Sequence, residues 1–256
     1  MNRFCFAALL APAVPLTAVA GDDHASHAVN QKDAVLAEVH DGIAPAFDIL
    51  AAHVHREGRV ITFHMTTNGV AGETTPEATG AFGGSAIWAY VWPTDLSPSV
   101  VGFEADTGIL ALAATNHPDF DDTPLFDENA DGDTGNDGGH WHSHWVVLVP
   151  NEECGPDALS VRDVPDGAEL AMPATWPGVP LFLDSPGYTP VFDGQEITIN
   201  VTLSATGADA IDGAAYDGVT SALRVNADLH APLACVSDVW DVASGDLSLP
   251  GRVAGQ

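Results

Sequence analysis

Residues 138–149 form the stretch GGHWHSHWVVLV, whose alternation predicts a β-strand with two different faces. Successive side chains of a strand point to opposite sides of the sheet, so every second residue shares a face. One face carries three histidines: His140, His142 and His144. The other face carries Trp141 and Trp145 and continues into valines, which is typical of a surface that packs on a core.

The histidine face is a candidate site for a transition metal. Its imidazoles follow one another at about 7 Å, twice the rise of a strand residue. Neutral imidazole is a common ligand for zinc, copper and nickel. Only three methionines occur in the chain, which argues against a thioether-rich Cu(I) carrier, and we expect zinc or copper rather than nickel. The alternative is a row of histidines that merely supplies polar groups to a half-exposed strand.

A β-hairpin is predicted for residues 49–66, ILAAHVHREGRVITFHMT, with its tip at Glu57-Gly58. Pairing around this tip puts His53 opposite Thr62 and gathers an apolar face: Leu50, Ala52, Val54, Ile61, Phe63 and Met65. The opposite face carries His53, His55 and His64. We expect this hairpin and the 140–149 strand to be neighbours in one sheet. His142 and His144 would then lie within about 4–5 Å of at least one hairpin histidine, around one ion.

An acidic loop spans residues 116–139 and contains eight acids but no lysine or arginine. Part of it resembles the first half of an EF-hand calcium loop, with oxygen side chains at positions 1, 3 and 5 and a glycine at position 6. Position 12, where that loop has glutamate, is Gly138. The candidate calcium ligands are Asp127, Asn129, Asp131, Asp133 and Asp137. The alternative is a solvated loop, and His117 at its start could join the histidine row.

The pattern of short apolar runs predicts the fold class. Runs at 87–92, 99–103, 109–115 and 195–203 have strand character and are separated by turns rich in glycine and proline. No long amphipathic segment or internal repeat accompanies them. We therefore predict an all-β protein, a single antiparallel β-sandwich of Ig-like or jelly-roll-like type with long irregular loops, over residues 33–245, followed by a C-terminal tail at 246–256.

The first 20 residues have the pattern of a secretory signal peptide. Arg3 precedes an apolar run, and Ala18-Val19-Ala20 has the form of a cleavage site. We expect cleavage after Ala20, a flexible tail over 21–32, and a periplasmic or secreted protein. Loss of the signal removes Cys5 and leaves Cys154 and Cys235. Two cysteines in an oxidising compartment predict one disulfide.

The net charge of −29 limits the range of partners. Such a surface repels nucleic acid and anionic lipid, and it attracts cations. No apolar run is long enough to predict a membrane span. We therefore expect metal ions as partners, and no sequence feature identifies a protein partner.

Three functional hypotheses follow from these patterns. No nucleophile elbow, phosphate-binding loop or dinucleotide fingerprint is present. The first hypothesis is an exported acidic protein that binds a transition metal through histidine-rich strands. The second is a metal-dependent enzyme that uses the same histidines. The third is a structural or adhesive β-sandwich module, stabilised by calcium, in which the histidines are incidental.

Overall fold

The computed structural model describes residues 33–255 of the chain. The predicted signal peptide, the predicted tail at 21–32 and Cys5 lie outside the described residues. The described part is nearly all β-structure with antiparallel sheets, which confirms the all-β prediction. None of its helices is both long and apolar enough to cross a membrane.

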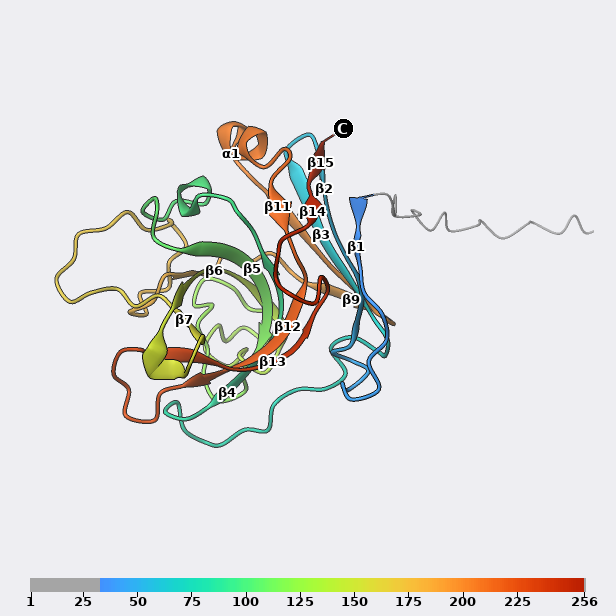
Figure 1. The fold of residues 1–256 in the computed structure, drawn as a ribbon. Helices are drawn as coiled ribbons and strands as arrows, with labels where there is room; N and C mark the ends of the chain where they lie inside the picture. The colour runs from blue at the N-terminus through green and yellow to red at the C-terminus, as the bar shows by residue number, and fades with distance from the viewer. Residues whose placement is uncertain (1–32, 256) are drawn as a thin grey trace, which may run out of the picture.

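One sheet is open and has six strands, in the order β1-β2-β3-β10-β9, with β15 also paired to β2. Its strands are β1 (Val35–Leu36), β2 (Ile49–Glu57), β3 (Val60–Thr67), β9 (Val191–Asp193), β10 (Glu196–Thr202) and β15 (Ala254–Gly255). All pairs are antiparallel except β15 with β2. Figure 1 shows this sheet at the right, beside the rest of the molecule.

The second sheet closes on itself, because β5 pairs with both β4 and β6 in the order β5-β4-β12-β13-β7-β6. Figure 1 shows these six strands arranged as a ring, and β8 pairs with β6 in addition. The strands are β4 (Ala86–Pro93), β5 (Ile109–Asn116), β6 (His142–Pro150), β7 (Leu159–Val161), β8 (Leu183–Asp184), β12 (Val219–Val225) and β13 (Ala234–Val242). The single sandwich is therefore not confirmed.

Two apolar interiors explain why the strands at 87–92 and 109–115 are apolar on both faces. Their outward residues pack against the open sheet. At this contact the ring of Phe63 meets the rings of Trp92 on β4 and Trp145 on β6 edge-on, with ring centroids 6.0 and 5.7 Å apart. Their inward residues line the barrel and form a second cluster with residues such as Val146 and Leu223. A sandwich would have one such interior, whereas closure of a sheet creates another.

Short elements connect the sheets: η2 (Pro98–Val100), η3 (Glu152–Cys154), α1 (Ala205–Ala210), β11 (Ala215–Tyr216) and β14 (Gly251–Arg252). The predicted strand at 99–103 is wrong. Pro98 begins a 3-10 turn there, and the Ser97 hydroxyl accepts a hydrogen bond from the Ser99 amide, which favours a turn. The predicted C-terminal tail also differs, since β14 and β15 pair with β11 and β2.

The hairpin at 49–66 is present as β2 and β3, but its register differs from the prediction. His53 pairs with His64 and His55 with Thr62, so the predicted pairing of His53 with Thr62 is wrong. A shift by two positions keeps every side chain on its face, and the apolar face is buried as predicted except at Leu50. An irregularity between Ile49 and Ala51 buries Ile49 in its place.

The disulfide predicted between Cys154 and Cys235 is present. It joins η3 to the start of β13, where the barrel wall is held by few strand contacts. β13 pairs with β12 along its length, but with β7 only between Cys235 and Ser160. We call this junction the β7–β13 seam. The covalent bond therefore reinforces the least paired part of the barrel.

Candidate metal centre

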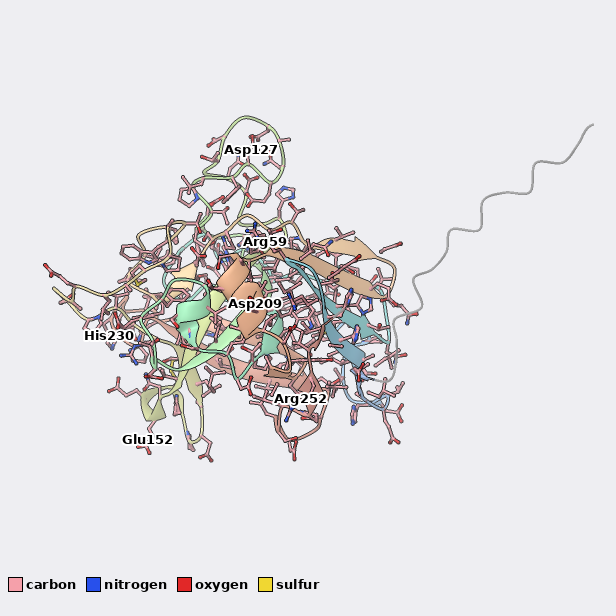
Figure 2. All side chains as sticks on the ribbon, turned by 90° about the horizontal axis from the view of Figure 1, so that it is seen from above. Arg59, Asp127, Glu152, Asp209, His230 and Arg252 are labelled. Carbon is pink, nitrogen blue, oxygen red and sulfur yellow. A yellow bond between two sulfur atoms is a disulfide. The ribbon has the colours of Figure 1, made fainter. Side chains whose placement is uncertain are left out.

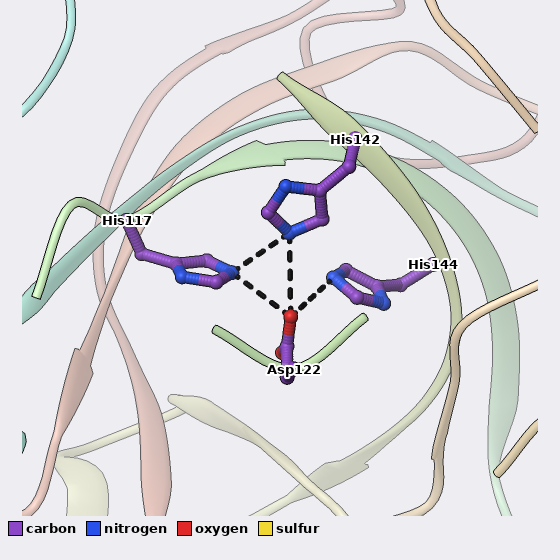
Figure 3. Close-up of side chains that lie close together, drawn as sticks. All are labelled: His117, Asp122, His142 and His144. Atoms are coloured by element: carbon purple, nitrogen blue, oxygen red, sulfur yellow. Dashed lines mark hydrogen bonds and ion pairs between the residues drawn. The ribbon is translucent and has the colours of Figure 1, made fainter. Parts of the chain in front are cut away.

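Four buried side chains meet at one end of the barrel, and we call them the His3Asp cluster: His117, Asp122, His142 and His144. Their exposed fractions are 1%, 6%, 2% and 1%. Figure 3 shows the three imidazole rings around the Asp122 carboxylate. One ligand atom from each residue lies within 4.8 Å of the others.

The alternation of two neighbouring strands places the three histidines. His142 and His144 lie on the inward face of β6, and Trp145 lies on its outward face in the core against the open sheet. On the partner strand β5, Thr115 pairs with His142. His117 comes two residues after Thr115 and reaches the same end of the barrel.

The acidic loop between β5 and β6 brings Asp122 to the histidines. The backbone carbonyl of Asp122 accepts a hydrogen bond from the Ser185 hydroxyl at 2.6 Å. The loop ends are tied together, because the His117 amide donates to the Gly138 carbonyl at 2.8 Å. A Cβ at Gly138 would lie 1.6 Å from the Phe120 carbonyl oxygen, so only glycine fits there. Figure 2 shows the tip of this loop, at Asp127, projecting from the body of the protein.

The spacing between the carboxylate oxygen and the three imidazole nitrogens is close to that around a tetrahedral ion. Asp122 Oδ1 lies 3.3 Å from Nε2 of His117, 3.3 Å from Nε2 of His142 and 3.2 Å from Nε2 of His144. The Nε2 atoms of His117 and His142 are 2.9 Å apart. Ligands at about 2.0–2.1 Å from a tetrahedral ion are separated by about 3.3–3.4 Å. The cluster therefore needs little adjustment to hold one.

Backbone carbonyls orient all three rings. Nδ1 of His117 lies 3.0 Å from the Phe120 carbonyl, Nδ1 of His142 lies 2.8 Å from the His140 carbonyl, and Nδ1 of His144 lies 3.2 Å from the Asp184 carbonyl. A carbonyl oxygen can only accept, so each Nδ1 carries the hydrogen. In the neutral ring, each Nε2 then presents a lone pair.

Three lone pairs and a carboxylate oxygen consequently face one point that holds no hydrogen-bond donor. Asp122 Oδ1 and His144 Nε2 are buried without a hydrogen-bond partner. Buried acceptors that face one another are costly unless a cation or a proton lies between them. Burial raises the pKa of Asp122, whereas positive charge at His144, His117 and His142 holds it well below its usual value. With neutral rings, a bound cation would supply that positive charge instead.

The structure brings together only some of the residues expected at a metal site. His117, His142 and His144 meet, whereas the His140 side chain is exposed and only its backbone carbonyl contributes. The three hairpin histidines lie on the open sheet, and within residues 33–255 they belong to no group of potential ligands: His53, His55 and His64. The expectation that they would join His142 and His144 in one sheet is wrong.

Barrel closure is the physical reason for that error. A single sandwich has one interior, so it would turn both hydrophobic faces inward and both histidine faces outward. The barrel has its own interior, which takes up the inward face of β6 with His142 and His144. Asp122 was not singled out because it is one of eight acids in the loop, and no local signal distinguishes it.

The acidic side chains of the predicted calcium loop are used by the backbone of the loop itself. The Asp127 carboxylate accepts hydrogen bonds from the amides of Asp131 and Gly132 at 3.1 and 2.8 Å. Asp137 is buried and accepts from the amides of Glu128 and Asn129. Within residues 33–255, groups of three or more potential ligands do not include Asp127, Asp131, Asp133 or Asp137.

A second group of potential ligands contains His40, Asp48 and Asp241. Its carboxylates already have partners. Asp241 accepts from the Ile49 amide at 2.7 Å, and Asp48 accepts from the Asn68 side chain at 3.0 Å. His40 is exposed, with 54% of its side chain accessible. These hydrogen bonds stabilise the start of β2. In the described residues, the carboxylates of this group are not left without partners as Asp122 Oδ1 is.

Comparison of the chain with protein-family models, with curated proteins and with solved structures finds no match.

Proposed function

We propose that this protein is an exported zinc-binding protein whose ion is held by His117, His142, His144 and Asp122. The observation that carries the proposal is the set of three imidazole rings, each oriented by a carbonyl on Nδ1, with their Nε2 atoms facing one unpartnered carboxylate oxygen. Nitrogen and oxygen ligands in a four-coordinate arrangement suit Zn²⁺, which has no geometric preference of its own.

The same arrangement favours binding over catalysis. Three imidazoles and a carboxylate fill the four positions of a tetrahedral ion, and all four residues are buried. Catalytic zinc sites keep one position for water or substrate, whereas closed sites serve structure or storage. A metal-dependent enzyme would require Asp122 to leave the ion, and turnover would distinguish that alternative.

Export is supported by two features of the chain. Residues 1–20 have the order of a signal peptide, and Cys154 and Cys235 form a disulfide, which is typical of oxidising compartments. Expression of the full chain with fractionation and intact-mass measurement tests this point. A mature protein that begins at Gly21 outside the cytoplasm supports it, and an uncleaved cytoplasmic protein contradicts it.

The zinc site is tested by calorimetric titration and elemental analysis of untagged protein with four matched variants. We expect one zinc per chain for the wild type. His144→Ala and Asp122→Asn should each lose on the order of 100-fold in affinity, because the first removes a ligand and the second removes the negative charge of one. His140→Ala and His53→Ala should bind like the wild type, since His140 contributes only its carbonyl and His53 lies on the other sheet. A wild type that binds no zinc, or a His144→Ala variant that binds equally well, would contradict the proposal.

A further inference from the structure

The barrel interior is not filled by its side chains. It encloses a cavity of about 480 Å³, which we call the barrel cavity. Small residues face it from three neighbouring strands: Ala89, Ala113 and Ser221. Longer aliphatic side chains at those positions would fill the space, as they do in small closed barrels. Sites for small molecules commonly enclose about 300–1,000 Å³, so the cavity is large enough for one.

The wall of the barrel cavity is apolar except at one end. Aliphatic side chains such as Val91, Val146 and Leu223 form most of it. The polar part of the wall is formed by His117, Asp121, Asp122, His144, Ser221 and Thr115. Among the described residues, the Thr115 hydroxyl is buried without a hydrogen-bond partner. Among residues 33–255, no lysine or arginine lines the cavity. A bound molecule therefore finds an extensive apolar surface, the hydroxyls of Thr115 and Ser221, and no lysine or arginine from residues 33–255.

The barrel cavity reaches the surface beside the β7–β13 seam. Val239 pairs with Ser221 and so faces the same side of the sheet. Val239 and Leu247 line the cavity although they are 55% and 37% exposed. In the described part of the chain, β13 has only β12 and β7 as neighbours, and β7 reaches it only at Cys235. The edge of β13 beyond that point leaves the barrel wall open, with an apolar rim.

We propose that the barrel cavity binds an uncharged, elongated apolar molecule that carries one hydroxyl group, of the class of long-chain alcohols. Its hydroxyl would hydrogen-bond to Thr115 at the inner end, and its chain would extend along the aliphatic wall toward Val239. Free fatty acids are disfavoured, because their carboxylate would lie near Asp121 and Asp122 with no lysine or arginine to pair with. A zinc ion at the His3Asp cluster would leave no coordination position for a carboxylate, because four protein ligands would surround it, so we expect the same preference with and without the ion.

The experiment measures displacement of the neutral fluorescent probe N-phenyl-1-naphthylamine from the purified protein, both zinc-free and after zinc addition. 1-Dodecanol, dodecanoate and dodecylamine serve as competitors of equal chain length. We expect dodecanol to displace the probe at least tenfold more effectively than either charged competitor. Absence of probe binding to the wild type, or equal displacement by dodecanoate or dodecylamine, would overturn the proposal.

Three variants locate the binding site. Ala113→Phe fills the barrel cavity and should weaken probe binding at least tenfold. Leu247→Glu, at the exposed rim of the barrel cavity, should also weaken probe binding at least tenfold, and it does not change the packed interior. Val191→Glu is the control, since Val191 is exposed to a similar degree, 54%, on β9 of the open sheet. Unchanged binding in Leu247→Glu would overturn the proposal even if Ala113→Phe failed to fold.

Thr115→Val tests the hydroxyl contact itself. Valine has nearly the same shape but cannot hydrogen-bond. We expect dodecanol to bind at least fivefold more weakly to this variant, while the naphthylamine probe binds as to the wild type. Equal dodecanol affinity in the two proteins would remove Thr115 from the site and overturn the proposed orientation.

Discussion

At the scale of single residues, the environment of each imidazole decides what it can do. His144 is oriented by a carbonyl on Nδ1 and faces Asp122, so it can serve as a ligand. His53 is also buried, at 4% exposure, but its Nδ1 has no hydrogen-bond partner and its ring stacks on that of His55 at 5.2 Å. The structure therefore buries His53 as a neutral imidazole in the open sheet and does not orient it as a ligand.

His53 should make the protein less stable in mild acid. Burial lowers the pKa of His53 to about 4, and neighbouring His55 and His64 add to this effect, while Asp33 opposes it. In the unfolded chain the pKa returns to about 6.5. Between these two values the unfolded state binds a proton that the folded state does not, so the free energy of unfolding falls as pH falls from about 6.5 toward 4.

His53→Gln should reduce that loss by on the order of 1 kcal/mol, because glutamine does not titrate. Urea unfolding at several pH values between about 4 and 6.5 measures the free energy of unfolding of both proteins. His140→Gln is the matched control, since the His140 side chain is exposed and outside the His3Asp cluster. Identical pH dependence in wild type and His53→Gln would contradict the prediction.

At the scale of elements, the β5–β6 loop lies at the candidate metal centre, and the β7–β13 seam lies beside the opening of the barrel cavity. The loop supplies Asp122 to the histidines of two neighbouring strands, and its ends are joined by backbone hydrogen bonds. The seam leaves the edge of β13 unpaired beyond Cys235. The barrel therefore carries its candidate metal centre at a tightly bonded end and its opening at a loosely paired edge.

Replacing both cysteines should destabilise the barrel at this seam. The Cys154–Cys235 bond closes a loop with a sequence separation of 81. Removal of a native disulfide of this kind costs roughly 2–4 kcal/mol, which corresponds to a melting temperature lower by roughly 4–16 °C. Calorimetry of the Cys154→Ser/Cys235→Ser double variant measures this.

Hydrogen exchange locates the effect of the same double variant. Amides of β7 and of the first half of β13 should exchange faster, whereas amides of β2 and β3 in the open sheet should change little. Uniformly faster exchange across both sheets would show that the bond stabilises the whole fold rather than the seam.

At the scale of the whole molecule, the acidic surface opposes the compact state. The net charge is −29, and most acids have no basic partner because only seven lysines and arginines are present. Repulsion among these carboxylates is stronger in the folded protein than in the expanded unfolded chain. The same field draws cations toward the protein.

Added salt should therefore stabilise the protein. Raising sodium chloride from about 0.05 M to about 0.5 M shortens the range of surface repulsion to a few ångströms, and the melting temperature should rise by several degrees. Differential scanning calorimetry measures the melting temperature at each salt concentration. The same molar range of sucrose controls for general solute effects. A melting temperature that is constant or falls with salt would show that surface repulsion contributes little.

The sequence alone determined those features that arise from local patterns. Alternation along the chain was enough to predict the hairpin faces, the all-β class and a two-faced strand at 140–149, which the structure forms as β6 from His142 to Pro150, because side-chain direction in a strand depends only on neighbouring residues. The pairing of Cys154 with Cys235 followed from the number of cysteines that remain after removal of the signal.

The tertiary structure alone decided that the sheet closes, that His142 and His144 point into a second interior, and that Asp122 joins His117 there. These depend on which strands pair across long stretches of chain, and no local periodicity encodes that choice.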